Sequence, residues 1–277
     1  MDGPSAAAFL EELCRPGGGP IEVPVLLLVA HPDDEVISAG TRLPRLSWIE
    51  VAYVTDGAPL DMRDAGRLGF RSREAYARAR AREADAGLAL VGVPRACVHR
   101  LGFTDQQAVL HLTDLTRAVL KLLRASGAQV VLTHAYEGGH PDHDATALAA
   151  HLACRLLGVN GAPAIVEFAG YHDRDGSGGM TMLEFLSGGA PVETAILDGP
   201  EEALKRRLVA CHATQAELLR RFPLDRERFR PAPAYDFAAP PHPWPPLYER
   251  FVTGLDGPRW REHAKTTLAA FAVAGPI

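Results

Sequence analysis

Residues 23–30 read Val-Pro-Val-Leu-Leu-Leu-Val-Ala, a run in which every residue is apolar. An apolar run without alternation is typical of a strand that is buried on both faces, as in a parallel sheet covered by helices. The run is far shorter than the roughly 20 residues that a helix needs to span a bilayer. It therefore predicts a central strand of an α/β protein.

Segments with the pattern of strands alternate with helical segments along the rest of the chain. The expected strands are residues 49–54, 98–103, 130–134, 165–169 and 192–197, and the expected helices are residues 72–90, 113–125, 144–157 and 201–222. Ser72 is a candidate N-cap for the first of these helices. Because strands that alternate with helices pair through right-handed crossovers, we expect an α/β fold with a mostly parallel sheet and helices on both faces.

Proline and glycine divide the chain into three expected parts. Residues 1–20 end in Pro-Gly-Gly-Gly-Pro and predict an N-terminal extension with a short helix, whereas residues 21–230 predict the α/β catalytic domain. Residues 231–277 begin with seven prolines before position 252, so their first part cannot be regular helix or central strand. Interleaved aromatic residues favour an arm that packs, with a final helix, on the same domain. A mobile linker is the alternative.

The composition excludes several classes of protein. Hydrophobic residues make up 47% and charged residues 23%, which excludes disorder for most of the chain. A net charge of −5 does not suit nucleic-acid binding, and four cysteines without a CxxC pair are no disulfide scaffold. The N-terminus does not resemble a signal peptide. We therefore expect a soluble, cytoplasmic protein without a nucleic-acid or membrane partner, and a homo-oligomer stays open.

A first polar segment, residues 30–35 (Ala-His-Pro-Asp-Asp-Glu), directly follows the predicted central strand. In open α/β sheets, ligands bind in the crevice at the carboxyl ends of the strands. Asp33 and Asp34 are adjacent carboxylates, which in a crevice need a cation or a proton. A divalent metal bound by His31 and Asp34 meets this need, and it leaves Asp33 free as a general base.

A second polar segment, residues 138–144 (Gly-Gly-His-Pro-Asp-His-Asp), follows the expected strand at residues 130–134. His143 would complete a His/His/Asp set with one position open for water, which is typical of catalytic zinc, although iron(II) also suits such a set. We expect one metal ion per chain. His140 is a candidate cationic stabiliser or acid, and Asp142 is a candidate to hold the tautomer of His140. Such a site suits hydrolysis of an amide or ester carbonyl.

Each segment also has an ordinary structural explanation. Residues 31–34 alone could form a turn with a capping aspartate, and residues 140–143 alone could form a helix start. Two such segments that both follow predicted buried strands favour the metal site. Nucleotide cofactors are disfavoured, because no GxGxxG sequence follows the first strand and no Walker sequence occurs.

The segments at residues 30–35 and 140–144 together resemble the two signature motifs of the PIG-L/LmbE-like deacetylases. This resemblance extends over roughly residues 21–172. It implies a Rossmann-like, LmbE-like fold, a catalytic zinc, and removal of N-acyl groups, mostly from N-acetylglucosamine-type substrates. By matching motif positions, it implies His31, Asp34 and His143 as zinc ligands, Asp33 as general base, and His140 as the histidine that stabilises the transition state.

The substrate-binding residues are less constrained by these motifs. Asp105 resembles the family's substrate-binding acid after the third strand. Some members polarise the carbonyl with a tyrosine at the position of Gly138, and here Tyr136 is the nearest tyrosine, out of register. Arg63 is a candidate for an anionic group of the substrate, while most arginines of residues 63–82 are expected on a solvated face. His172 ends a late strand and either lines the pocket or lies in a surface loop.

Other histidines and acids receive a structural interpretation. Glu35 is expected to start a helix or to support the site without direct chemistry. Five histidines belong to no cluster in the sequence and are predicted to be structural: His99, His111, His151, His212 and His263.

We therefore expect a zinc-dependent hydrolase that removes an N-acetyl or other N-acyl group from an amino sugar or an amino-sugar conjugate. Two alternatives stay open. A metallo-phosphoesterase would release phosphate from an aryl phosphate, but it usually needs a second metal. A catalytically inactive sugar-binding or metal-binding module would bind a glycan without releasing an amine, but such a module has no need of a free base.

Overall fold

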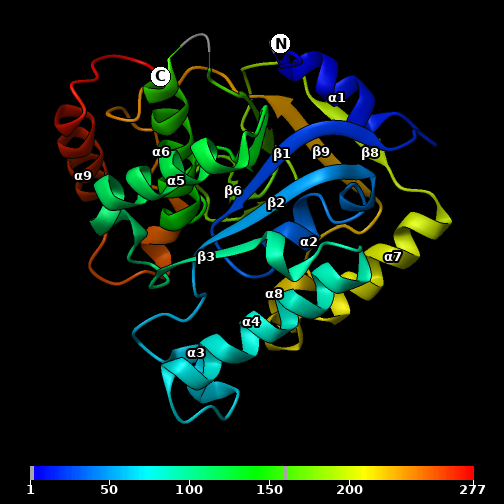
Figure 1. The fold of residues 1–277 in the computed structure, drawn as a ribbon. Helices are drawn as coiled ribbons and strands as arrows, with labels where there is room; N and C mark the ends of the chain where they lie inside the picture. Colours follow the sequence, from blue (N-terminus) through cyan, green and yellow to red (C-terminus); the bar gives the residue numbers. More distant parts are fainter. Residues whose placement is uncertain (1–2, 159–160) are drawn as a thin grey trace.

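A seven-stranded sheet forms the centre of the protein in the computed structural model, which describes residues 3–158 and 161–277 (Figure 1). The strand order is β3-β2-β1-β4-β5-β9-β8, and neighbours among the first five strands are parallel. β9 and β8 continue the sheet in antiparallel pairs. The strands are β1 (Ile21–Val29), β2 (Leu46–Thr55), β3 (Val98–Phe103), β4 (Val130–His134), β5 (Ala164–Phe168), β8 (Glu193–Ile196) and β9 (Arg226–Pro231). The expected α/β class with a mostly parallel sheet is confirmed.

β1 is the central strand that its apolar run predicts, because β2 and β4 pair with its two edges. Its side chains alternate between two hydrophobic cores. Val25, Leu27 and Val29 belong to one core, and Leu26 and Leu28 belong to the other. Both faces of β1 are therefore buried, which explains why the run carries no polar residue.

Helices cover both faces of the sheet (Figure 1). One core includes side chains of α5 (Leu112–Ser126), α6 (Pro141–Leu157) and α9 (Gly257–Ala270). The other includes side chains of α1 (Ala6–Cys14), α2 (Asp34–Ser38), α4 (Arg73–Leu90), α7 (Gly199–Ala210) and α8 (Ala216–Leu219). The short helix α3 (Arg63–Arg67) precedes α4, and a small hairpin is formed by β6 (Tyr171–Asp173) and β7 (Met180–Met182).

Most helix predictions agree with the structure, with one exception. Ser72 caps α4 as expected, because its Oγ accepts a hydrogen bond from the Ala75 N–H at 3.2 Å. The expected single helix at residues 201–222 is wrong. α7 ends at Ala210, a 3₁₀ turn follows at Ala213–Gln215, and α8 follows that turn. His212, which is fully buried, lies in this break.

The proline-rich residues 231–256 pack against the α5–α6–α9 side of the sheet. Phe237, Leu247 and Tyr248 are buried there with Trp260 of α9. The indole N–H of Trp260 donates to the Pro141 carbonyl at 3.1 Å, directly at the start of α6. The described helices include none that is both long and apolar enough to cross a membrane.

Candidate functional site

The two polar segments meet at the carboxyl ends of β1 and β4. The first follows β1 and leads into α2, and the second forms the start of α6, where His140 is the N-cap. Adjacent parallel strands end at the same edge of a sheet, which is why segments about a hundred residues apart converge here. In the described part of the chain, three groups of closely spaced potential metal ligands occur, and all lie at this edge.

Three predicted metal ligands form a triangle of side chains, in which Asp34 faces the two histidines with different carboxylate oxygens. Nδ1 of His31 lies 3.3 Å from Oδ2 of Asp34 and 3.3 Å from Nε2 of His143, and Nε2 of His143 lies 3.4 Å from Oδ1 of Asp34. Ligand atoms that bind one tetrahedral zinc ion at 2.0–2.1 Å lie about 3.3–3.4 Å from one another. Each of the three contacts is close to that spacing, so the side chains lie near enough to hold one metal ion between them.

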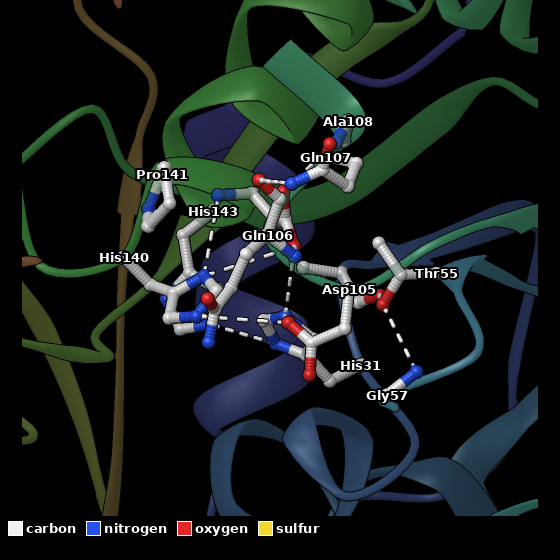
Figure 2. A network of polar contacts seen from close by, with 12 residues as sticks. His31, Thr55, Gly57, Asp105, Gln106, Gln107, Ala108, His140, Pro141 and His143 are labelled. Carbon is white, nitrogen blue, oxygen red and sulfur yellow. Dashed lines mark hydrogen bonds and ion pairs between the residues drawn. The ribbon is translucent and has the colours of Figure 1, made fainter. Parts of the chain in front are cut away.

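The ring of His31 is oriented by two carboxylates, and Figure 2 shows one of them, Asp105, beside the ring. Its Nε2 lies 3.2 Å from Oδ1 of Asp105 and 3.3 Å from Oδ2 of Asp142, while its Nδ1 faces Asp34 and His143. A carboxylate on the second ring nitrogen is the usual support of a metal-binding histidine, because it fixes the tautomer and the ring orientation. His31 is thus prepared to bind metal through Nδ1.

Asp142 has a different neighbour from the one that the sequence suggested. Its carboxylate accepts hydrogen bonds from the backbone N–H groups of Gln106 and Ala108, at 2.6 and 3.1 Å, and faces His31. Towards His140 it comes only to 4.0 Å, and the Nδ1 of His140 accepts instead from the backbone N–H of Asp142. Asp142 therefore orients His31 and the 105–108 loop, and the tautomer of His140 is set by a backbone amide.

His134 is close to the triangle but is a poor ligand through its nearer nitrogen. Its ring stacks on His143 with centroids 4.0 Å apart, and its Nε2 lies 3.3 Å from Oδ2 of Asp34. That same Nε2 accepts the backbone N–H of Ala30 at 3.0 Å, so its lone pair is already used. Burial lowers the pKa of His134 to about 3, which keeps the ring neutral.

Asp33 and Asp34 are adjacent but have opposite electrostatic surroundings. Burial alone would raise the pKa of Asp34, but the imidazoles of His143 and His134 hold it well below its usual range. Burial raises the pKa of Asp33 to about 7. The Arg80 guanidinium lowers this pKa, and the neighbouring Asp34 carboxylate raises it. A carboxylate with a pKa near neutrality suits a general base, whereas a strongly acidic one suits a metal ligand.

Arg80 of α4 holds the Asp33 carboxylate, with Nη2 3.1 Å from Oδ2. The same guanidinium donates to the carbonyls of Gly57 and Pro32, at 2.5 and 2.9 Å, and lies 3.8 Å from Asp105. The expectation that the arginines of this helix form a solvated face is therefore wrong for Arg80, which is buried. The helical spacing does contain a signal, because positions 76, 80, 84 and 88 share the buried side of α4.

His140 presents Nε2 at the site as a neutral donor. Because its Nδ1 accepts a backbone N–H, the ring proton is on Nε2. Burial and the nearby His31 hold the pKa of His140 well below its ordinary value. The sequence suggested a cationic stabiliser or an acid for His140, whereas this geometry favours a neutral hydrogen-bond donor.

These residues open into a pocket of about 260 Å³. Its polar wall includes Asp33, Asp105, Gln106 and Arg80, and its apolar wall includes Ile37, Pro59, Tyr171, Met180, Leu218 and Phe251. A larger groove of about 470 Å³ lies at the other end of β1 and β2, but none of its lining residues is a histidine and its one carboxylate is Glu50. The two polar segments thus face the smaller pocket and not this groove.

Two of the expected substrate-binding residues, Arg63 and Tyr136, lie outside the pocket. Arg63 is 65% exposed on α3 and pairs with Asp61 at 3.3 Å. Tyr136 is buried in the core against Trp260, and its hydroxyl donates to the Ala239 carbonyl at 2.9 Å. The structure therefore brings neither residue to the pocket, because Arg63 is exposed beside Asp61 and Tyr136 is packed in the core.

His172 also points away from the pocket. On the short strand β6 its ring faces the Glu184 carbonyl, with Nε2 3.1 Å from the oxygen. Neighbouring residues of a strand point to opposite faces, so Tyr171 lines the pocket instead. The ring centroids of Tyr171 and His143 lie 5.2 Å apart in an edge-on arrangement. Asp105 alone among the predicted substrate-binding residues lies in the pocket wall.

Phe251 was not predicted as a site residue. It comes from the end of the proline-rich segment, and its ring lies nearly parallel to that of His140 with centroids 5.8 Å apart. Together with Tyr171 and Leu218 it shows that residues far beyond the two motifs complete the pocket. The sequence offers no spacing rule that would place them there.

Comparison with known families supports the resemblance of the two motifs. Residues 26–162 match the sequence model of the PIG-L family, which is described as GlcNAc-PI de-N-acetylase. This chain carries a PIG-L family domain. The matched segment contains every residue of the proposed metal triangle and Asp33. No curated protein matches the chain.

The PIG-L fold is also found among solved structures. A deacetylase in the biosynthesis pathway of teicoplanin is 18% identical, with a TM-score of 0.60, and the match covers 76% of this chain and 97% of that chain. N,N'-diacetylchitobiose deacetylase from Pyrococcus horikoshii is 21% identical, with a TM-score of 0.52, 76% and 84% coverage. The 4-carboxy-2-hydroxymuconate hydratase GalB from Pseudomonas putida KT2440 is 18% identical, with a TM-score of 0.50, 72% and 82% coverage. At these identities the likeness concerns the fold.

Proposed function

We propose that this PIG-L family protein is a metal-dependent hydrolase that removes an N-acetyl or other N-acyl group from an amino sugar or an amino-sugar conjugate. The observation that carries the proposal is the close approach of His31, Asp34 and His143, with contacts of 3.3–3.4 Å between their ring nitrogens and carboxylate oxygens, beside a buried Asp33 that Arg80 orients. An open metal site with a separate base is the arrangement that amide hydrolysis needs.

The proposed mechanism assigns one task to each side chain. A divalent metal held by His31, Asp34 and His143 would polarise the acyl carbonyl and lower the pKa of the attacking water. Asp33 accepts the proton of that water and returns it to the departing amine. His140 donates its Nε2–H to the carbonyl oxygen as negative charge develops there. Asp105 and Arg80 lie where hydroxyl groups of a sugar could bind.

Zinc is the proposed metal, at one ion per chain, and iron(II) is the alternative for the same His/His/Asp set. One structural relative, 18% identical to this chain, is described as the zinc-inhibited form of teicoplanin deacetylase Orf2. Reconstitution of the metal-free protein with each ion in turn, followed by measurement of activity, distinguishes the two.

An amino sugar is the proposed substrate because two independent lines support it. The family is described as GlcNAc-PI de-N-acetylase, and structural relatives are described as deacetylases of teicoplanin biosynthesis and of N,N'-diacetylchitobiose. The pocket is lined by both polar and apolar side chains, which suits a sugar ring with hydroxyl groups at its edge and an apolar face. The fold alone does not decide the reaction, since GalB is described as a hydratase.

The decisive experiment measures metal content and amine release together. The purified protein is loaded with one equivalent of zinc and incubated with N-acetylated glucosamine, chitobiose and hydrophobic N-acyl glucosamine conjugates. We expect primary amine to be released from at least one substrate class, and we expect His31→Ala to lose both metal and activity. Release of phosphate from an aryl phosphate without amine release would favour the phosphoesterase alternative. Metal and glycan binding without either product would favour the inactive binding module.

A further inference from the structure

Three consecutive carboxylates, Asp33, Asp34 and Glu35, are buried at the start of α2, with exposures of 4%, 4% and 0%. Three buried negative charges in sequence are costly unless each has its own positive partner or proton. The proposed reaction accounts for two of them, because Arg80 faces Asp33 and the metal site holds Asp34. Glu35 has no task in that mechanism, so its partner must be found elsewhere.

The partner of Glu35 is His212. Nε2 of His212 lies 3.4 Å from Oε1 of Glu35, and both side chains are fully buried. Burial lowers the pKa of His212, but the Glu35 carboxylate outweighs burial and raises it above the ordinary value. Among the described residues, no other lysine, arginine or histidine forms an ion pair with Glu35.

The other oxygen of Glu35 holds the backbone of Asp33. Oε2 accepts the backbone N–H of Asp33 at 2.9 Å. Asp33 has φ of 144° and ψ of −21°, a conformation that residues other than glycine rarely adopt and that costs of order 1–3 kcal/mol. Such a conformation persists only where neighbouring groups impose it, and it turns the Asp33 carboxylate away from Asp34 towards Arg80.

We propose that His212 is a positioning residue for the proposed deacetylation: by pairing with Glu35, it keeps Glu35 on the backbone N–H of Asp33 and so holds the general base in place. The inference rests on the proposed function of Asp33. It adds a residue from outside the matched family segment of residues 26–162 to the support of the base.

The local structure around His212 agrees with this role. The helix that the sequence predicts through residues 201–222 is interrupted at His212, which has φ of −96° and ψ of 62°. α7 therefore stops, and the chain turns so that the imidazole enters the space beside Glu35 and α4. A Cβ placed on Gly87 of α4 would lie 3.5 Å from Nε2 of His212, which shows that the ring packs directly against this helix.

The test compares three variants of the zinc-loaded protein. His212→Leu removes the ring nitrogens, His212→Gln keeps an N–H donor, and His151→Leu is a matched control. His151 is also a buried histidine beside a buried glutamate, 3.8 Å from Glu167, but it lies outside the pocket. We expect His212→Leu to lower kcat about a hundredfold, with KM and metal content unchanged. The reason is that a displacement of a catalytic group by about 1 Å lowers the rate by about this factor. We expect His212→Gln to retain at least a tenth of the wild-type kcat, and His151→Leu to retain nearly all of it.

A crystal structure of His212→Leu gives a readout that does not depend on turnover. We expect the Glu35–Asp33 hydrogen bond to be broken and φ of Asp33 to become negative. An unchanged kcat, or an unchanged Asp33 backbone, would overturn the proposal. If the wild-type protein releases no amine from any substrate, the proposed function fails, but the two crystal structures still decide whether His212 positions Asp33.

A double variant, E35Q/H212L, covers the case in which His212→Leu does not fold. The glutamine is neutral, so it needs no cation, and its side-chain oxygen still accepts the backbone N–H of Asp33. We expect the double variant to fold and to retain kcat within about tenfold of wild type. A folded double variant with kcat a hundredfold lower, and with Asp33 still in its native conformation, would show that His212 acts in another way and would refute the proposal.

Discussion

The segment that matches the family and the remainder of the chain contribute different things to one pocket. Residues 26–162 provide the proposed metal ligands, the proposed base Asp33 and Arg80, all on the ends of parallel strands or on the helices beside them. The later residues provide Tyr171 and Phe251 in the walls and His212 beneath the base. The comparison teaches that the reacting groups must be particular atoms at fixed distances. The side chains that line the pocket need only the right shape, and those that support the base need only a polar partner, so many sequences can supply them.

The two regions meet at the glycines that precede His140. A Cβ on Gly139 would lie 1.8 Å from the carbonyl oxygen of Tyr171, so no other residue fits under β6. A Cβ on Gly138 would lie 2.8 Å from the His242 imidazole, and Gly138 has φ of +69°. The second motif is therefore shaped as much by the packing of later segments as by its own chemistry.

Loss of a metal ligand tests the division between the regions most strongly. We expect His143→Ala to abolish amine release and to weaken metal binding by more than about a hundredfold. Mutation of residues that only hydrogen-bond to metal ligands already lowers metal affinity about 10–100-fold. Elemental analysis after dialysis and an amine-release assay measure both. His172→Ala is the matched control, because this buried histidine faces the Glu184 carbonyl outside the pocket. Full metal retention by His143→Ala would remove it from the ligand set.

Loss of the base separates chemistry from metal binding. We expect Asp33→Asn to keep its metal but to lower kcat by about 10²–10⁴-fold, because an amide cannot accept the proton. The measurement is single-substrate kinetics on protein of verified metal content. Turnover within a few-fold of wild type would exclude Asp33 as the base.

Loss of Arg80 should affect stability as well as rate. In Arg80→Met, the carbonyls of Gly57 and Pro32 lose their donor and Asp33 loses its cation. Breaking a buried ion pair costs about 3–5 kcal/mol, so we expect the free energy of unfolding to fall by about that amount. Arg78→Met, at an exposed position of the same helix, should change it by less than about 0.5 kcal/mol. Equal denaturation midpoints for the two variants would contradict the buried role of Arg80.

A wall residue from the later region should change affinity and leave the chemistry intact. We expect Phe251→Ala to raise KM about three- to tenfold, the equivalent of an aromatic contact, with metal content and kcat retained. Steady-state kinetics on the best substrate measures this. A loss of kcat as large as that of Asp33→Asn would break the division between the two regions.

The smallest effect is expected at Tyr136, which the sequence suggested as a partner of the carbonyl. Tyr136→Phe removes only the hydrogen bond to the Ala239 carbonyl, so we expect about 1 kcal/mol of stability to be lost and kcat to be unchanged. Chemical denaturation and kinetics measure the two effects. A marked fall in kcat would place Tyr136 back in the site.

The sequence predicted best the elements whose residues carry their own pattern. The expected strands at residues 98–103 and 130–134 coincide with β3 and β4. β9 was missed because its sequence, Arg-Glu-Arg-Phe-Arg-Pro, is mostly charged. Two of its four charges are buried in pairs with other segments: Glu227 with Lys205 at 2.5 Å and Arg230 with Glu167 at 2.8 Å. A pattern of hydrophobicity cannot identify a strand whose partners neutralise its charge.

The sequence alone predicted the parallel sheet and the position of the two polar segments at its carboxyl edge. It also predicted the types of side chain that a hydrolytic metal site needs. These follow because strand burial and metal ligation depend on local runs and on residue type. The contact of Arg80 with Asp33 and that of His212 with Glu35 came only from the folded chain. Each joins segments distant in sequence, and the partner of a buried charge depends on which segment packs against it, a choice that no local pattern encodes.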